Sequence, residues 1–171
     1  MMMLSIFAIF SIFIITFSSF ILPFSFPFSP PLPVLGAIFH FEGKIPTNLG
    51  VTDGKLFNCP STPNCVISQE ADNIHYIPPL NYNGDRLQAY NSLLKILSVV
   101  PNTKIIEQKE DYIHTESRSK IMGFVDDAEF YFPLNKNVIQ WRSASRLGES
   151  DLGVNRRRLE QIRLAFEDFN A

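Results

Sequence analysis

Residues 126–145 read DDAEFYFPLNKNVIQWRSAS, in which polar and apolar side chains alternate on either side of a short polar turn. Successive side chains of a β-strand point to opposite faces of a sheet, so this alternation predicts two half-buried strands, Asp126–Pro133 and Val138–Ser145. Two further strands are expected before them, at Lys104–Gln108 and Tyr112–Ser119. The short connections between all four strands favour an antiparallel meander.

One face of these strands is apolar or carries only small hydroxyl groups. Its members on the last three strands are Ile113, Thr115, Ser117, Ala128, Phe130, Phe132, Ile139, Trp141 and Ser143. Apolar side chains recur at helical spacing in Asp85–Val99 and in Leu152–Phe169, which predicts two amphipathic helices. We expect both helices to cover the apolar face. The predicted fold class is α+β: a four-stranded antiparallel meander with two helices on one side.

The stretch between residues 45 and 83 is rich in Pro, Asn, Gly and Ser. This composition indicates ordered loop, with at most a short strand at His75–Ile77. Residues 45–171 contain no internal repeat and are long enough for one hydrophobic core. They are therefore expected to form a single α+β domain.

The start of the chain differs sharply from the rest. Residues 1–41 contain no Asp, Glu, Lys or Arg, and residues 1–22 are almost entirely apolar. At about 1.5 Å per residue, such a segment can cross a bilayer as a helix. It predicts a transmembrane anchor that makes the membrane a partner. A cleaved signal segment and a mis-assigned start codon are the alternatives, and residues 23–44 form a Pro/Phe-rich linker.

The charge of the chain argues against a nucleic-acid partner. The 171 residues include 15 Lys and Arg against 17 Asp and Glu, for a formal net charge of −2 at pH 7. Nucleic-acid binding relies on an excess of basic side chains. No motif for a cofactor is present either, so no cofactor is expected.

The second face of the predicted strands is polar, and its neighbours depend on the register. We expect the turn before residue 126 to pair Arg118 with Asp127. The same register places Glu116 beside Glu129. Placing Phe130 beside Trp141 in the core also places Arg142 beside Glu129. The prediction is a row of Glu116, Glu129 and Arg142 across three strands.

Two interpretations of this row stay open. Two carboxylates that share one guanidinium can leave one of them protonated near neutral pH, as acid–base catalysis requires. The candidate catalytic residues of such a hydrolase-like enzyme are Glu116, Glu129, His114 and Arg142. The alternative is a structural ion cluster on the solvent face of the sheet.

The tract from residue 142 to 158 contains five arginines, three of which fall in the opening turns of the last predicted helix. Cations there oppose the helix dipole, so something must offset them. The acidic row, an anionic ligand and anionic lipid headgroups are the three candidates. If a ligand or protein partner binds, we expect the site to comprise Arg142, Arg146, Asn155 and Arg156.

The only two cysteines, Cys59 and Cys65, flank a turn that contains two prolines. If their Cβ atoms face one another, a disulfide can close this loop, and an exported chain meets oxidising conditions. Two free buried thiols are the alternative. A zinc site would need two more ligands, and His75 is the only histidine nearby, so no metal is expected.

Several stretches together resemble the motifs of one known family. They are Cys59–Val66 (CPSTPNCV), His75–Ile77 (HYI), Gly123–Phe130 (GFVDDAEF), and Arg142–Arg146 (RSASR) with Gly153–Arg156 (GVNR). The family is catalogued as domain of unknown function 1499, and the resemblance covers roughly Leu49 to Asp168. The resemblance implies no activity, because the family has none established. It does imply an exported or lumenal protein, since members occur in bacteria, including cyanobacteria, and in plastids.

These observations together predict a membrane-anchored domain in the periplasm or the thylakoid lumen. Its expected function is non-enzymatic binding of an anionic ligand or a protein partner at an arginine-rich surface. The hydrolase-like enzyme is the competing function. The two differ in geometry, because an enzyme needs its catalytic groups to converge in a concave pocket.

Overall fold

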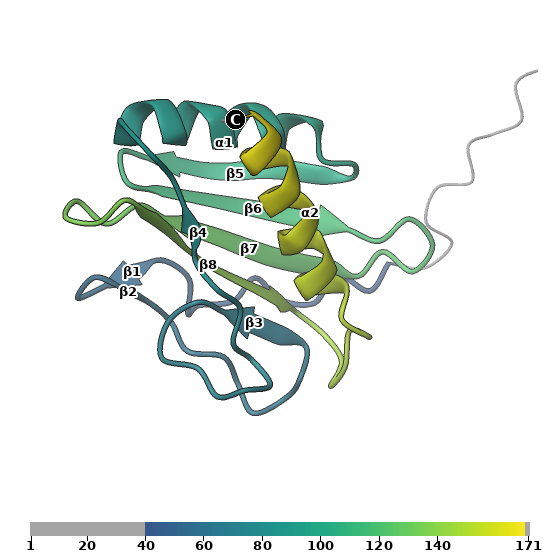
Figure 1. Cartoon of the computed structure of the whole chain (residues 1–171). Helices are drawn as coiled ribbons and strands as arrows, with labels where there is room; N and C mark the ends of the chain where they lie inside the picture. Colours follow the sequence, from purple (N-terminus) through teal and green to yellow (C-terminus); the bar gives the residue numbers. More distant parts are fainter. Residues whose placement is uncertain (1–39, 170–171) are drawn as a thin grey trace, which may run out of the picture. The chain divides into compact units, whose positions relative to one another are not determined.

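A six-stranded antiparallel sheet carries two helices on one face (Figure 1). This computed structural model describes residues 40–169. The elements are β1 (Val51–Thr52), β2 (Lys55–Leu56), β3 (Cys65–Ile67), β4 (Leu80–Asn81), α1 (Arg86–Val99), β5 (Thr103–Lys109), β6 (Tyr112–Arg118), β7 (Val125–Tyr131), β8 (Val138–Ser145) and α2 (Val154–Phe169). The α+β class, the antiparallel sheet and both helices are confirmed.

The predicted number of strands is wrong, because the sheet has six strands where the sequence indicates four. Its order is β3-β8-β7-β6-β5, and β4 pairs with a second stretch of β8. Both added strands come from the stretch predicted as loop, and they hydrogen-bond the free edge of β8. Strands of two or three residues are too short to show alternation. At the predicted strand His75–Ile77, only Tyr76 forms an isolated bridge, with Ile67.

The predicted transmembrane helix at residues 1–22 lies outside the described residues, as does the linker as far as residue 39. Within residues 40–169, neither helix is both long enough and apolar enough to span a bilayer.

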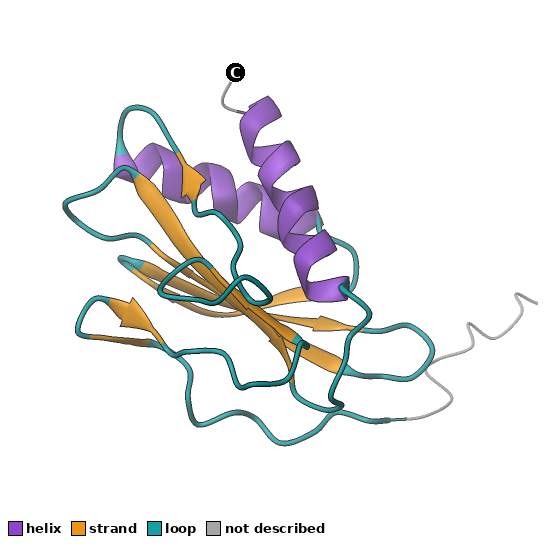
Figure 2. Cartoon of the chain, turned by 60° about the horizontal axis from the view of Figure 1, so that its bottom comes forward, coloured by secondary structure: helices purple, strands orange, loops and turns teal. Residues whose placement is uncertain are grey.

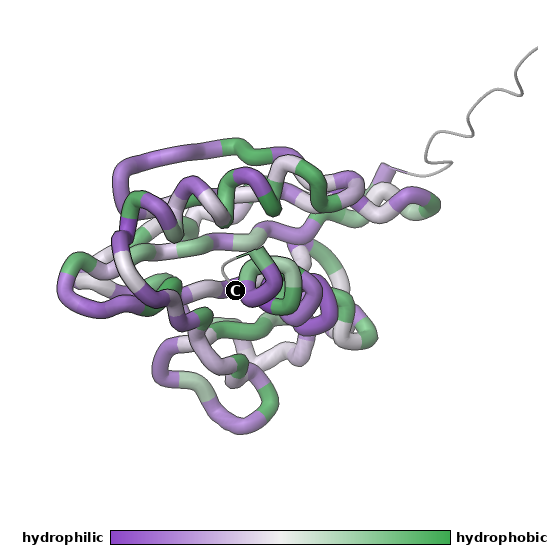
Figure 3. The backbone as a smooth tube through the Cα atoms, turned by 45° about the horizontal axis from the view of Figure 1, so that its top comes forward, coloured by the Kyte–Doolittle hydropathy of each residue, from purple (hydrophilic) through white to green (hydrophobic). Residues whose placement is uncertain are grey.

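The core lies between the sheet and the two helices. The apolar face of the central strands is buried as predicted, with Phe130, Phe132 and Trp141 fully enclosed. Leu93 and Leu97 of α1 and Leu159, Ile162 and Phe166 of α2 pack against them. Hydrophobic residues recur along both helices between hydrophilic ones, as expected for helices that bury one side (Figure 3).

The helices begin at aspartates that cap them. Asp85 accepts a hydrogen bond from the amide of Gln88 at 3.0 Å and precedes α1. Asp151 accepts hydrogen bonds from the amides of Gly153 at 3.0 Å and Asn155 at 2.7 Å, at the start of α2. These carboxylates satisfy amides that have no partner within the helix.

The register is correct for one strand pair and wrong for the other. β7 and β8 pair Phe130 with Trp141 and Glu129 with Arg142, as predicted. β6 and β7, however, pair Glu116 with Asp127, whereas the predicted alignment paired Arg118 with Asp127, so the register is shifted by two residues. The β6–β7 loop explains the shift, because the Ser119 amide donates to the Phe124 carbonyl at 2.9 Å and closes a tighter turn. A two-residue shift keeps each side chain on its face and changes only its neighbours.

The opposite face of the sheet is covered rather than exposed to solvent. The chain from residue 40 to 60, which includes the β1–β2 hairpin, runs beneath this face (Figures 1 and 2). Leu56, Ile67 and Tyr112 form a second apolar cluster there. His114, Asp127, Glu129 and Arg142, which were predicted to face solvent, are therefore buried between two layers, while Glu116 is partly exposed.

A matched pair of substitutions tests the helix-side core. Phe132 is fully buried and packs against Tyr90, with 5.1 Å between ring centroids, whereas Leu134, two residues later, is 75% exposed. Phe132→Ala should lower the free energy of unfolding by about 3–5 kcal/mol, because it leaves a cavity. Leu134→Ala should change it by less than about 0.5 kcal/mol. Urea denaturation measures both, and similar losses would contradict this core.

Candidate functional site

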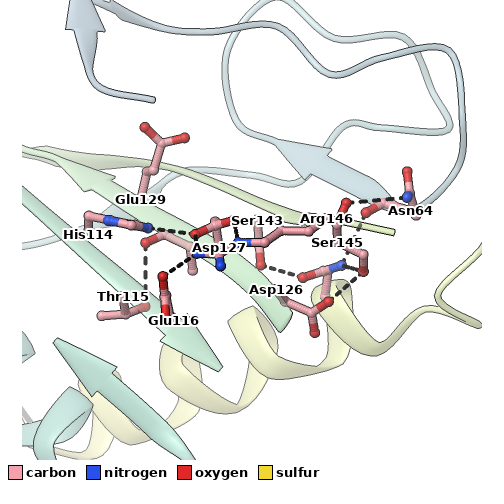
Figure 4. A network of polar contacts seen from close by, with 12 residues as sticks. Asn64, His114, Thr115, Glu116, Asp126, Asp127, Glu129, Ser143, Ser145 and Arg146 are labelled. Atoms are coloured by element: carbon pink, nitrogen blue, oxygen red, sulfur yellow. Dashed lines mark hydrogen bonds and ion pairs between the residues drawn. The ribbon is translucent and has the colours of Figure 1, made fainter. Parts of the chain in front are cut away.

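The covered face of the sheet contains a buried network of charged and polar side chains, which we call the acid–arginine cluster (Figure 4). Its members are Tyr112, His114, Glu116, Asp127, Glu129, Arg142 and Arg146. The first five come from β6 and β7, Arg142 lies in β8, and Arg146 follows the last residue of β8. Strand alternation places the six strand residues on one face, and Arg146 contacts Glu116 and Asp127 there.

Glu129 is completely buried, and its carboxylate is fully hydrogen-bonded. Its Oε1 accepts from the Gly50 amide at 2.6 Å and from the Tyr112 hydroxyl at 2.8 Å. Its Oε2 accepts from Nη1 of Arg142 at 2.9 Å. Burial, together with the adjacent Glu129 carboxylate, raises the pKa of Tyr112, so the phenol remains a donor.

Asp127 is a second buried carboxylate, and it contacts Arg146 and His114. Nε and Nη2 of Arg146 donate to its two oxygens at 2.8 Å each, and Nε2 of His114 lies 2.8 Å from Oδ1. Burial alone would raise the pKa of Asp127, but the hydrogen bonds from Arg146 and His114 outweigh it and lower the pKa. The same contact with Asp127 raises the pKa of Arg146. Arg146 also pairs with Glu116.

The predicted row of two glutamates around one arginine is therefore wrong in detail. Arg142 pairs with Glu129 as expected, but Glu116 pairs with Arg146. The register shift between β6 and β7 moves Glu116 away from Glu129. The sequence did contain a signal that Arg146 lies near these acids. Arg142 and Arg146 are four residues apart, so continued alternation past β8 places both on one face.

A cleft of about 560 Å³ lies beside the cluster. One wall is the segment from Lys44 to Asn48, and another is the loop from Asn58 to Pro60. The floor is formed by Asp127, Arg142, Ala144, Ser145 and Arg146. Glu116, Glu129 and His114 do not line it, so only Arg142 of the four candidate catalytic residues reaches the cleft.

Arg142 lines this cleft, and one of its donors is buried and unused. The residue is only 3% exposed, and its Nε has no hydrogen-bond partner among the described residues. A buried unpaired donor costs about 1–3 kcal/mol, so such atoms are rare. Lys44 on the wall also makes no ion pair within residues 40–169. The lining of the cleft therefore includes one cation without an ion pair, Lys44, and one donor without a partner, Arg142 Nε, among the described residues.

The structure separates the four residues predicted as an anion site. Arg142 and Arg146 share the cleft, but Asn155 and Arg156 belong to α2 on the other side of the sheet. Asn155 is fully buried, with Ser143 Oγ donating to its Oδ1 at 2.5 Å and its Nδ2 donating to the Asn64 carbonyl at 3.1 Å. Its role there is to join α2 to β8 and to the loop before β3.

The arginines at the start of α2 find partners within the domain. Arg156 donates to the carbonyls of Ile74 at 2.9 Å and Tyr76 at 2.7 Å. Arg158 pairs with Asp126 at 2.6 Å. These contacts offset charges that oppose the helix dipole, but the partners are Asp126 and backbone carbonyls, whereas Glu116 and Glu129 of the predicted acidic row pair with other arginines.

The disulfide between Cys59 and Cys65 is confirmed, with 5.7 Å between the Cα atoms. Cys65 lies in β3, and Cys59 lines the cleft. The bond therefore ties one wall of the cleft to the edge of the sheet. Within residues 40–169, no group of three His, Cys, Asp or Glu side chains is placed to hold a metal ion.

Removing one partner of the buried ion pair should destabilise the fold. Arg142→Met leaves the Glu129 carboxylate buried without its cation, so we expect a loss of about 3–5 kcal/mol in the free energy of unfolding. Lys55→Met, at the exposed pair with Glu70, should cost at most about 1 kcal/mol. Urea denaturation compares them. The double variant Arg142→Met with Glu129→Gln should recover part of the loss, and no recovery would argue against coupling.

The lowered pKa of Asp127 predicts acid sensitivity. Because the carboxyl group holds its proton less tightly in the folded state, its stabilisation is complete above the unfolded pKa of about 3.9 and is lost as the pH falls through the folded value. Asp127→Asn should therefore flatten the decline in stability below pH 4, although it lowers stability at pH 7. The exposed Asp53→Asn is the control. Equal acid dependence of both variants and the wild type would refute this assignment.

Comparison with protein families finds a match over residues 55–166 to the family described as "Protein of unknown function (DUF1499)". The match begins in β2 and ends in α2, so it includes the disulfide and the whole acid–arginine cluster. The segment from Lys44 to Asn48 precedes it. No curated protein and no solved structure matches this chain. The family match covers more than half of the sequence, and the chain belongs to this family.

Proposed function

We propose that this domain is a non-enzymatic binding module that holds a small anion in the cleft at Arg142 and Arg146. The ligand class is a molecule with a carboxylate or phosphate group. The observation that carries the proposal is the buried Nε of Arg142, which lacks a partner within residues 40–169 and belongs to a side chain that lines a cleft of about 560 Å³.

The way Arg142 is held supports this role. Its Nη1 is bound to Glu129, which fixes the plane of the guanidinium. Its Nε has no partner among the described residues, and a guanidinium edge matches the paired oxygens of a carboxylate or phosphate. Because Glu129 holds the side chain in advance, little conformational entropy is lost on binding. Lys44 adds positive charge at the wall, where Asn48 and Asn58 offer amide donors.

The geometry supports the hydrolase-like alternative less well. Glu116 and Glu129 pair with different arginines, and neither lines the cleft. Asp127 is the only carboxylate on the floor, and its lowered pKa opposes the role of a general acid. Its oxygens already accept three hydrogen bonds from Arg146 and His114.

The proposal places the domain outside the cytoplasm, in the periplasm or the thylakoid lumen, with residues 1–22 as its membrane anchor. The Cys59–Cys65 disulfide supports an oxidising compartment. The charge-free sequence of residues 1–39 supports an anchor.

The cleft is tested by titrating the full chain, in neutral detergent, with inorganic phosphate and separately with acetate. Calorimetry should show binding of at least one anion. Asn58→Asp adds a negative charge to the wall and should weaken that binding about tenfold. Asn91→Asp, on the exposed side of α1, is the matched control. Comparing the two anions shows which group is preferred.

Two results would overturn the proposal. One is the absence of binding by both phosphate and acetate. The other is equal affinity of the Asn58→Asp and Asn91→Asp variants, which would show that the anion binds away from the cleft.

A further inference from the structure

Exposed apolar side chains gather where the described chain begins, and we call them the entry patch. They are Phe41, Ile45, Ile121, Phe124 and Leu147, each at least 38% exposed. Ile121 is 69% exposed and forms part of the β6–β7 loop. In Figure 3, the hydrophobic tip of this loop lies next to the point where the chain enters the domain.

Contacts bring three distant segments together in this patch. The Phe41 ring stacks on Phe124 with 5.5 Å between centroids, and the Phe41 amide donates to the Met122 carbonyl at 3.2 Å. At Gly43, a Cβ atom would come within 2.9 Å of both Arg146 Cβ and Leu147 Cγ. The backbone from residue 41 to 43 therefore lies directly against the other two segments.

The β6–β7 loop holds its apolar side chains outward in a defined conformation. The Phe124 amide donates to Ser119 Oγ at 3.0 Å, and the Gly123 amide donates to the Ser119 carbonyl at 3.2 Å. Arg118, just before the loop, pairs with Glu42. The exposure of Ile121 is therefore a property of an ordered turn.

We propose that the entry patch docks on the interface of a lipid bilayer. The chain immediately before it, residues 1–39, contains no Asp, Glu, Lys or Arg. Aromatic and aliphatic side chains favour the level of the lipid headgroups, and lysines beside them can extend their amines to water or phosphate. Lys44 and Lys120 occupy such positions, next to Ile45 and Ile121.

Docking by this patch orients the domain on the membrane. Ile45 belongs both to the patch and to the wall of the cleft, so the cleft would lie close to the headgroups. The β7–β8 turn, at the other end of the central strands, would point away from the bilayer (Figure 1). The docking proposal does not depend on ligand binding in the cleft.

The orientation is tested with a fluorophore on a single introduced cysteine in the full chain. The native cysteines are joined in a disulfide, so Ile121→Cys can be labelled selectively without reductant. Leu134→Cys in the β7–β8 turn is the matched control, since both positions are exposed and apolar. The chain is reconstituted in phosphatidylcholine vesicles with a minority of phosphatidylglycerol. Spin-labelled lipid should quench the label at residue 121 several-fold more strongly than the label at residue 134.

Equal quenching at the two positions would overturn the proposal. A second contradicting result is a label at residue 121 that is shielded from water in the absence of lipid and is not quenched by spin-labelled lipid in vesicles. Another part of the chain or a second copy would then cover the patch. Failure of the chain to associate with vesicles would also overturn it. Titrating the same variants with phosphate and acetate tests the cleft independently, so failure of membrane docking can be distinguished from failure of anion binding.

Discussion

The structure depends on neutralising a carboxylate that is buried in the middle of a sheet. Glu129 lies on the central strand β7 and is enclosed by the chain on one side and the sheet on the other. Removing such a group from water costs several kcal/mol unless it is paired and hydrogen-bonded. Tyr112, Arg142 and the Gly50 amide supply those contacts. The Gly50 contact also requires the chain before β1 to lie over this face, so Glu129 helps to position the covering layer.

β8 connects this ion pair to both the core and the cleft. One of its faces places Trp141 in the helix-side core, and the other places Arg142 and, just past the strand, Arg146 beside the acids. Its outer edge pairs with β3, which carries Cys65 of the disulfide. The floor of the cleft is formed by residues of β7 and β8 and by Arg146, which follows β8. Its walls, by contrast, are loop segments, and only the one at Cys59 is covalently tied to the sheet.

The two arginines of the cleft differ in how completely the protein uses them. Arg146 makes contacts with both Asp127 and Glu116, so its charge is matched within the domain. Arg142 pairs through Nη1 and leaves Nε without a partner among the described residues. In the proposed anion site, this asymmetry makes Arg142 the main contact and leaves Arg146, which also lines the cleft, with a largely structural role. The same cleft borders the entry patch through Ile45, so anion and membrane contacts would occur at one end of the domain.

Alternation and helical spacing in the sequence were sufficient to predict the two helices, the four long strands and the buried aromatic face, because these features depend on local periodicity. The pairing of Glu129 with Arg142 followed from placing Phe130 beside Trp141 in the core. The short strands β3 and β4 show no such periodicity. Only the tertiary structure set the β6–β7 register, since alternation tolerates a two-residue shift and the turn geometry selects one alignment. Only the tertiary structure also shows that residues 40–60 cover the polar face. This covering layer forms a cleft with Asp127, Arg142 and Arg146, and Asn155 and Arg156 lie outside that cleft. Contacts between such distant segments leave no local pattern in a single sequence.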